Sequence, residues 1–177
     1  MRQIGQEFLL QSGREAKRLK KSADHAIGQL SVANLYTSLD EDGNCVAVLM
    51  KHIAGSLRRY CRQTLKPQEK ISRYHPRLEF TIEEGESMEV VRAHWEKAWE
   101  SFFQALGSLC EEDVLRSTQA GEEQASLLRT LQFNQSHLAF HVGQIVFLAK
   151  HLKGCDWEPL QEGRPSNGPA LVERKCC

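Results

Sequence analysis

Apolar residues recur every three to four positions along most of the chain, the spacing that places them on one face of an α-helix. Charged and polar residues fill the positions between them, as expected of amphipathic helices. The pattern predicts four long helices, at residues 3–30, 45–66, 88–109 and, from a start near 123–126, up to 153.

The segments between these helices carry turn and capping residues. Ser31 is suited to cap a single turn that ends at Tyr36, and Asn44 is suited to cap the second helix. The longest irregular stretch, 67–86, contains two prolines, and a loop of that length is expected to be functional or to pack over something. Residues 110–122 are polar and are predicted to be a connection, and no segment has the pattern of a strand.

Four long helices joined by mostly short links favour one architecture. We predict an all-α fold, an antiparallel four-helix bundle, formed by a single domain over residues 1–153. The remaining residues, 154–177, are rich in proline and glycine and are predicted to form an extended tail that packs on the bundle or trails from it. Gly154 is a good residue to end the fourth helix.

Composition narrows the classes of function. The chain has 177 residues, with 23 Lys+Arg and 23 Asp+Glu, so its formal net charge is zero. This balance argues against a nucleic-acid binder, whose affinity depends on neutralising phosphates. No stretch approaches the roughly 18 apolar residues needed to cross a membrane, and the start does not have the order of a secretory signal. Six cysteines without metal-ligand spacing predict a reduced, cytoplasmic protein, with Cys176 and Cys177 as exposed thiols on the tail.

The fourth predicted helix carries a polar stripe within an apolar segment. From His137 to Ala149 the sequence HLAFHVGQIVFLA has no charged residue. Asn134, His137, His141 and Gln144 follow one another at offsets of three, four and three, so they lie on one face. Burying such groups without partners costs a few kcal/mol each, so either they bond one another, backbone carbonyls or buried water, or His137 and His141 bind a metal ion.

A third candidate ligand lies on the second predicted helix. His52 stands in the segment KHIAGSLRRY, beside the apolar stripe of that helix. Three neutral imidazoles leave one to three coordination positions for water or substrate, and nitrogen ligands suit Zn, Ni, Fe or Cu. The alternative is that His52 is a half-buried structural histidine. The other histidines have no spaced partner and are interpreted as structural: His25, His75, His94 and His151.

Two segments carry a family resemblance: VLMKHIAGSLRR on the second predicted helix and HLAFHVGQIVFLAKHL on the fourth. Together they resemble the DinB/YfiT-like superfamily of metalloenzymes, and more narrowly a bacterial branch of unknown function. The resemblance implies a four-helix bundle, often a homodimer, with His52, His137 and His141 as metal ligands. The chain departs from the branch at Ser56, where Asn is usual, and in the loop after the second helix. Activities in the wider superfamily include thiol-dependent S-transfer and metal-dependent hydrolysis.

The first hypothesis is therefore a metal-dependent enzyme that acts on a small molecule, as an S-transferase or a hydrolase. A divalent transition metal (Zn, Ni or Fe) would be held by the three histidines, with Asn134 and Gln144 as supporting or substrate-orienting groups. No side-chain nucleophile has a paired base, so the nucleophile would be metal-bound or come from a cosubstrate such as a low-molecular-weight thiol. Two alternatives stay open: a non-enzymatic, metal-binding or stress-associated dimer, and a bundle with a satisfied polar core and no metal.

The third predicted helix suggests the oligomeric state. Trp95, Trp99, Phe102 and Phe103 lie on both sides of its apolar seam, which is more aromatic surface than one core face requires. A large apolar surplus commonly marks an interface, so a homodimer is expected.

Overall fold

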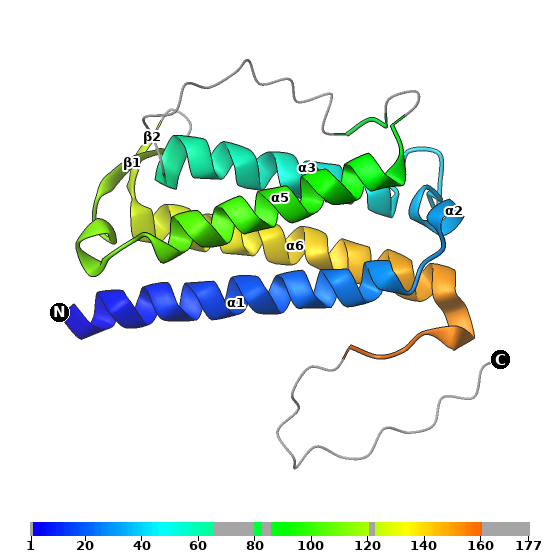
Figure 1. Cartoon of the computed structure of the whole chain (residues 1–177), viewed down its shortest axis with the longest axis horizontal. Coiled ribbons are helices and arrows are strands. Elements are labelled where there is room, and N and C mark those ends of the chain that lie inside the picture. The colour runs from blue at the N-terminus through cyan, green and yellow to red at the C-terminus, as the bar shows by residue number, and fades with distance from the viewer. Residues whose placement is uncertain (1, 66–79, 83–85, 121–122, 161–177) are drawn as a thin grey trace, which may run out of the picture.

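The computed structural model describes residues 2–65, 80–82, 86–120 and 123–160, and this part of the chain is mostly helical. Four long helices lie side by side (Figure 1): α1 (Arg2–Gly28), α3 (Val46–Tyr60), α5 (Met88–Gly107) and α6 (Leu127–Lys153). Shorter elements join them: α2 (Val32–Leu35), the π-helical turn η1 (Cys61–Leu65), the 3-10 turns η2 (Glu111–Asp113) and η3 (Gly154–Asp156), and the strands β1 (Ser117–Ala120) and β2 (Glu123–Ser126).

Helices α1 and α6 run in the same direction. Gln135, near the start of α6, donates a hydrogen bond to the carbonyl of Ser12 on the first half of α1. At the other end, the backbone of Glu158 exchanges hydrogen bonds with the side chain of Gln29, just beyond α1. The first halves of the two helices therefore lie beside each other, and so do their ends.

Helices α3 and α5 also run in the same direction, opposite to α1 and α6. Lys51, on the first half of α3, pairs with Glu86 just before α5, and Tyr60, at the end of α3, has its ring against Phe102. The predicted bundle was antiparallel, and this is wrong for two pairs of neighbours: α3 runs parallel to α5, and α1 runs parallel to α6 (Figure 1). A short link forces the next helix to reverse, whereas the segment between Leu65 and Met88 is long enough to return along α3 before α5 begins.

The aromatic residues of α5 fill the core. Trp95, Trp99 and Phe102 are at most 2% exposed, and Phe103 is half-buried. Trp95 also donates a hydrogen bond to Asp24 on α1 at 2.9 Å. The expectation that these rings form surplus surface for a dimer is therefore wrong. A helix packed against two neighbours buries a wider face than its seven-residue seam alone suggests.

A short hairpin precedes α6, contrary to the expectation of no strand. β1 and β2 pair antiparallel, from Ser117 opposite Ser126 to Ala120 opposite Glu123. Hydrophobic periodicity gives no signal here, because both strands consist of small and polar residues. Ser126 then caps α6 by accepting a hydrogen bond from the backbone N–H of Arg129, within the range in which the helix was predicted to begin.

The helix ends agree in part with the predicted caps. Ser31 caps α2 as expected, but the residue that precedes α3 is Cys45, not Asn44, and its side chain makes no capping hydrogen bond. Gly154 ends α6 with a positive φ of 60°, a conformation that favours glycine.

The tail begins against the end of α1, where Glu158 contacts His25 of that helix and Gln29 just beyond it. Most of the loop 67–86, and residues 161–177 with Cys176 and Cys177, lie outside the described residues. Cys155 is disulfide-bonded, so the expectation that all six cysteines are reduced is wrong at this residue. In the part of the chain that is described, no helix combines the length and the apolarity required to cross a membrane.

Candidate metal centre

Helices α3 and α6 are antiparallel neighbours, and their contact brings the three predicted histidines together. His52 projects from α3 and is 6% exposed, whereas His137 and His141, one turn apart on α6, are half-buried. The ligand atoms of the three residues lie within 4.8 Å of one another. Residues 85 positions apart in sequence therefore meet in one cluster.

The nitrogens converge at a spacing that suits one ion. His137 Nε2 lies 3.1 Å from His52 Nε2 and 3.1 Å from His141 Nε2. Nitrogens that bind one ion at about 2.0–2.1 Å in tetrahedral geometry are separated by about 3.3 Å. The cluster that the structure describes contains histidines alone, without carboxylate or thiolate. Three neutral donors would leave the full charge of a divalent ion uncompensated and part of its coordination sphere open.

Gln144 determines which nitrogen of His141 faces the cluster. The Gln144 Oε1 atom lies 2.8 Å from His141 Nδ1, and a carbonyl oxygen only accepts, so Nδ1 carries the proton and donates it. His141 Nε2 is then the nitrogen with the free lone pair. Ligating histidines typically donate their other ring N–H to a carbonyl or carboxylate in this way. Gln144 thus lies where the sequence predicts a supporting residue.

Burial keeps His141 in the form that can bind a metal. Desolvation lowers the pKa of His141 below its ordinary value, and the charge of His52 acts in the same direction, whereas the hydrogen bond to Gln144 opposes the shift. Histidine binds metal only when neutral. The depressed pKa therefore extends the pH range over which His141 is a competent ligand.

Two phenylalanines border the cluster. The ring of Phe80 stacks on that of His52 at a centroid distance of 4.4 Å, and the ring of Phe140 meets His141 edge-on at 5.3 Å. Phe80 and Phe140 are 43% and 65% exposed, so both reach the surface beside the histidines. Between Arg129 and Lys150, α6 itself carries no Asp, Glu, Lys or Arg.

The chain matches the profile of a family described as protein of unknown function (DUF1572) over residues 3–165. The chain belongs to the DUF1572 family. No curated protein and no solved structure matches it. Membership in DUF1572 supplies no activity, so the chemistry has to be argued from the site itself.

Asn134, the other predicted supporting residue of this DUF1572 protein, is 4% exposed, and its Nδ2 atom makes no hydrogen bond within the described chain. It lies one turn before His137, but no hydrogen bond in that part of the structure joins it to the three histidines. The remaining histidines that the structure describes lie apart from the cluster: His94 and His151 are exposed, and His25 contacts the carbonyl of Glu158. His75 is outside the described residues.

Three further neighbours of the cluster were not predicted as site residues. Ser56 Oγ lies 3.5 Å from His137 Nδ1, one turn after His52 on the same face of α3. Its position was visible in the sequence as an i+4 neighbour of His52. Phe140 adjoins His141, but an apolar residue in an apolar helix gives no signal. Phe80 comes from the irregular loop, where no periodicity indicates a contact with α3.

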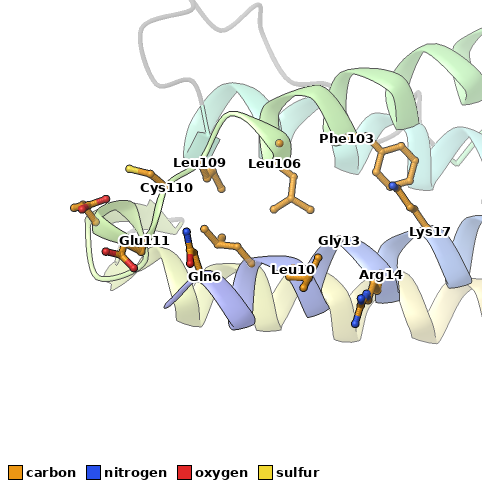
Figure 2. Close-up of a pocket in the computed structure, with 13 residues that line it drawn as sticks. Gln6, Leu10, Gly13, Arg14, Lys17, Phe103, Leu106, Leu109, Cys110 and Glu111 are labelled. Atoms are coloured by element: carbon orange, nitrogen blue, oxygen red, sulfur yellow. The ribbon is translucent and has the colours of Figure 1, made fainter. Parts of the chain in front are cut away.

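A separate groove of about 630 Å³ lies between the first half of α1 and the end of α5 (Figure 2). Leu10 and Leu106 face it, Arg14 and Lys17 lie toward one end, and Glu111 lies at the other. None of its lining residues belongs to α3 or α6, so it is not the mouth of the histidine cluster.

Proposed function

We propose that this DUF1572 protein is a metal-dependent enzyme that acts on a small molecule. His52, His137 and His141 would hold one divalent transition metal (Zn, Ni or Fe) through their Nε2 atoms. The observation that carries the proposal is the position of His137 Nε2, 3.1 Å from the Nε2 atoms of both His52 and His141, with the orientation of His141 set by Gln144. If two lone pairs pointed at each other at this distance they would repel, and a cation satisfies all three nitrogens at once.

The fold supports the same proposal. We infer that α1, α3, α5 and α6 form a four-helix bundle of the DinB/YfiT-like type, with the ligands on two facing helices of its interior. The paired sequence segments around His52 and around His137 and His141 support this assignment. Metal sites in bundles are commonly built from side chains on facing helices.

The proposed chemistry is thiol-dependent S-transfer or hydrolysis. When bound, a divalent ion lowers the pKa of a water molecule or thiol, so that a nucleophile forms near neutral pH. The chain's own residues would then orient the ligands and the substrate. Gln144 would hold the ring of His141, and Phe80 and Phe140 would offer apolar walls to the substrate. We expect the part of the substrate next to the ion to be neutral and apolar. We propose a cytoplasmic location, where low-molecular-weight thiols are abundant; the cysteines lack the regular spacing of a disulfide framework, although Cys155 itself is disulfide-bonded.

A substrate screen tests the enzymatic proposal. The untagged protein would be loaded with Zn, Ni or Fe and assayed for conjugation of low-molecular-weight thiols to apolar electrophiles and for hydrolysis of neutral esters and amides. We expect an activity that a chelator removes, that added metal restores and that is absent from His137→Ala. A protein that binds metal in stoichiometric amounts but turns over no substrate in the screen would contradict the enzymatic proposal and favour the non-enzymatic metal-binding alternative.

Gln144→Leu is expected to lower metal affinity about 10- to 100-fold, the usual cost of removing a partner that orients a ligating histidine. Gln144→Glu, which keeps an acceptor for His141 Nδ1–H, should stay close to wild type. Competition with a chromogenic chelator at pH 7.5 measures both. Equal affinity of wild type and Gln144→Leu would show that the hydrogen bond to His141 does not support the site.

A further inference from the structure

The groove between the first half of α1 and the end of α5 has apolar walls. Leu10 of α1 and Leu106 of α5 face it from opposite sides (Figure 2), and Leu10 is 49% exposed. Its volume of about 630 Å³ lies within the range of sites that bind small molecules. A ligand that covers these walls removes apolar surface from water, which favours binding. This cavity, called the α1–α5 groove below, therefore has the size and the apolar surface of a ligand site.

Two glycines keep the α1–α5 groove open. A Cβ atom on Gly13, near the middle of α1, would meet only Leu106 Cδ2, at an ordinary contact distance of 3.8 Å. A Cβ atom on Gly107, at the end of α5, would meet nothing within 4 Å, and neither glycine has a positive φ. Glycine lowers helix stability relative to alanine. The chain's own packing and backbone do not require glycine at these two positions, whereas a larger side chain would occupy the groove.

The two ends of the α1–α5 groove carry opposite charges. At one end the Lys17 side chain extends from α1 toward Phe103, and Arg14 lies beside it (Figure 2). Within the described residues no carboxylate pairs with Lys17. At the other end lie Glu111 and Glu112 of the turn η2. An apolar anion would match only the first end and an apolar amine only the second, so the best complement carries both charges with an apolar part between them.

The length of the α1–α5 groove limits the size of such a ligand. A Cβ atom on Gly5 would lie 3.0 Å from Glu111 Cβ, so the acidic end is level with Gly5 of α1. Lys17 is twelve residues further along this helix, which corresponds to about 18 Å at about 1.5 Å per residue. An extended peptide rises about 3.3 Å per residue. Four or five residues therefore span the distance between the two charged ends.

We propose that the α1–α5 groove binds a short apolar peptide with free termini. Its N-terminal ammonium lies beside Glu111 and Glu112, and its C-terminal carboxylate lies beside Lys17. Side chains alternate along an extended peptide, so every second one faces the apolar walls. The exposed amide of Gln6, which also lines the groove, can donate to or accept from one backbone group of the peptide. The proposal is independent of the metal, because no residue of α3 or α6 lines this groove.

Blocking one terminus of the peptide and removing its partner on the protein test the same contact. The probe is Leu-Ala-Leu-Ala, titrated into the full chain by nuclear magnetic resonance. We expect N-acetylation and C-amidation each to raise its dissociation constant about 5- to 10-fold. Lys17→Met should weaken the free peptide by the same factor and leave the C-amidated form unchanged. The double variant Glu111→Gln/Glu112→Gln should do so for the N-acetylated form. Lys21→Met, at an exposed residue of α1 outside the groove, is the matched control.

Filling the α1–α5 groove tests its location. Gly13→Leu places a side chain between the two walls and should raise the dissociation constant at least about 10-fold. Its helical circular dichroism and melting temperature should stay at or above those of wild type, because leucine favours a helix more than glycine does. Gly28→Leu makes the same change at an exposed position of α1 outside the groove and should bind the peptide as wild type does.

Octanoate and hexylamine are the competing ligands, and each should bind at least about 10-fold more weakly than the peptide. The proposal is overturned if Leu-Ala-Leu-Ala does not bind at about 5 mM, or if Gly13→Leu folds and binds it as wild type does. Octanoate that binds as tightly as the peptide, and is weakened by Lys17→Met, would make the groove a site for apolar anions and also overturn it. Loss of affinity in Lys17→Met that is equal for the free and the C-amidated peptide would contradict the proposed orientation.

Discussion

Replacing His52 with alanine is expected to weaken metal binding by about 100-fold or more, and His137→Ala and His141→Ala should do the same. Removing a ligand costs at least as much as removing the partner of a ligand, for which the usual loss is 10- to 100-fold. The two histidines that remain in each variant would have to hold the ion with water in place of the third. Isothermal titration with Zn and with Ni, and elemental analysis of the purified untagged proteins, measure this loss.

His94→Ala and His25→Ala serve as controls, because both histidines lie apart from the cluster and should leave affinity and stoichiometry unchanged. His52 is the decisive position, since it is the one ligand of the three that α3 provides. Full retention of metal by His52→Ala would contradict a site shared by α3 and α6. Circular dichroism of each variant without metal should show that the helices persist, because the apolar core does not depend on the ion.

Trp99→Ala is expected to lower the free energy of unfolding by about 3–5 kcal/mol, the usual cost of removing a large aromatic side chain from a core. Trp99 is fully buried, and its ring contacts those of Trp95, Phe102 and Phe103. Truncation leaves a cavity that the neighbouring rings can only partly fill. Urea unfolding, followed by circular dichroism at a fixed protein concentration, measures the change.

Two comparisons define what that result means. Trp99→Phe keeps most of the volume, and Trp99 Nε1 makes no hydrogen bond in the described part of the chain, so this variant should lose much less stability than Trp99→Ala. Leu115→Ala, at an exposed residue, should change stability by less than about 0.5 kcal/mol. If Trp99→Ala instead dissociated a dimer without destabilising the subunit, the indole would lie at an interface and the assignment of α5 to the core would be wrong.

The sequence predicted the four long helices because their apolar spacing is a local property, readable within each segment. It also predicted the members of the histidine cluster. His137 and His141 are one turn apart on one helix, so their common face follows from helical geometry alone. Gln144 follows from the same spacing. These are relations between residues that are close in the chain.

Other features depended on contacts between distant segments. The parallel course of α3 and α5 depends on which end of α3 the start of α5 packs against, which no residue pattern within either helix specifies. The burial of Trp99 depends on how many neighbours α5 has. The hairpin before α6 has strands of small and polar residues, so its pairing left no hydrophobic signal.

The sequence by itself determined which residues share a helical face, and therefore proposed Asn134, His137, His141 and Gln144 as one polar stripe. Only the tertiary structure decided that His52 reaches that stripe, that Phe80 stacks on His52, and that Phe133, Phe140 and Phe147 stay exposed while Trp95, Trp99 and Phe102 of α5 are buried. The physical reason is that side-chain periodicity follows from local backbone geometry, whereas the choice of which face meets which neighbour is made when whole helices pack and exclude water.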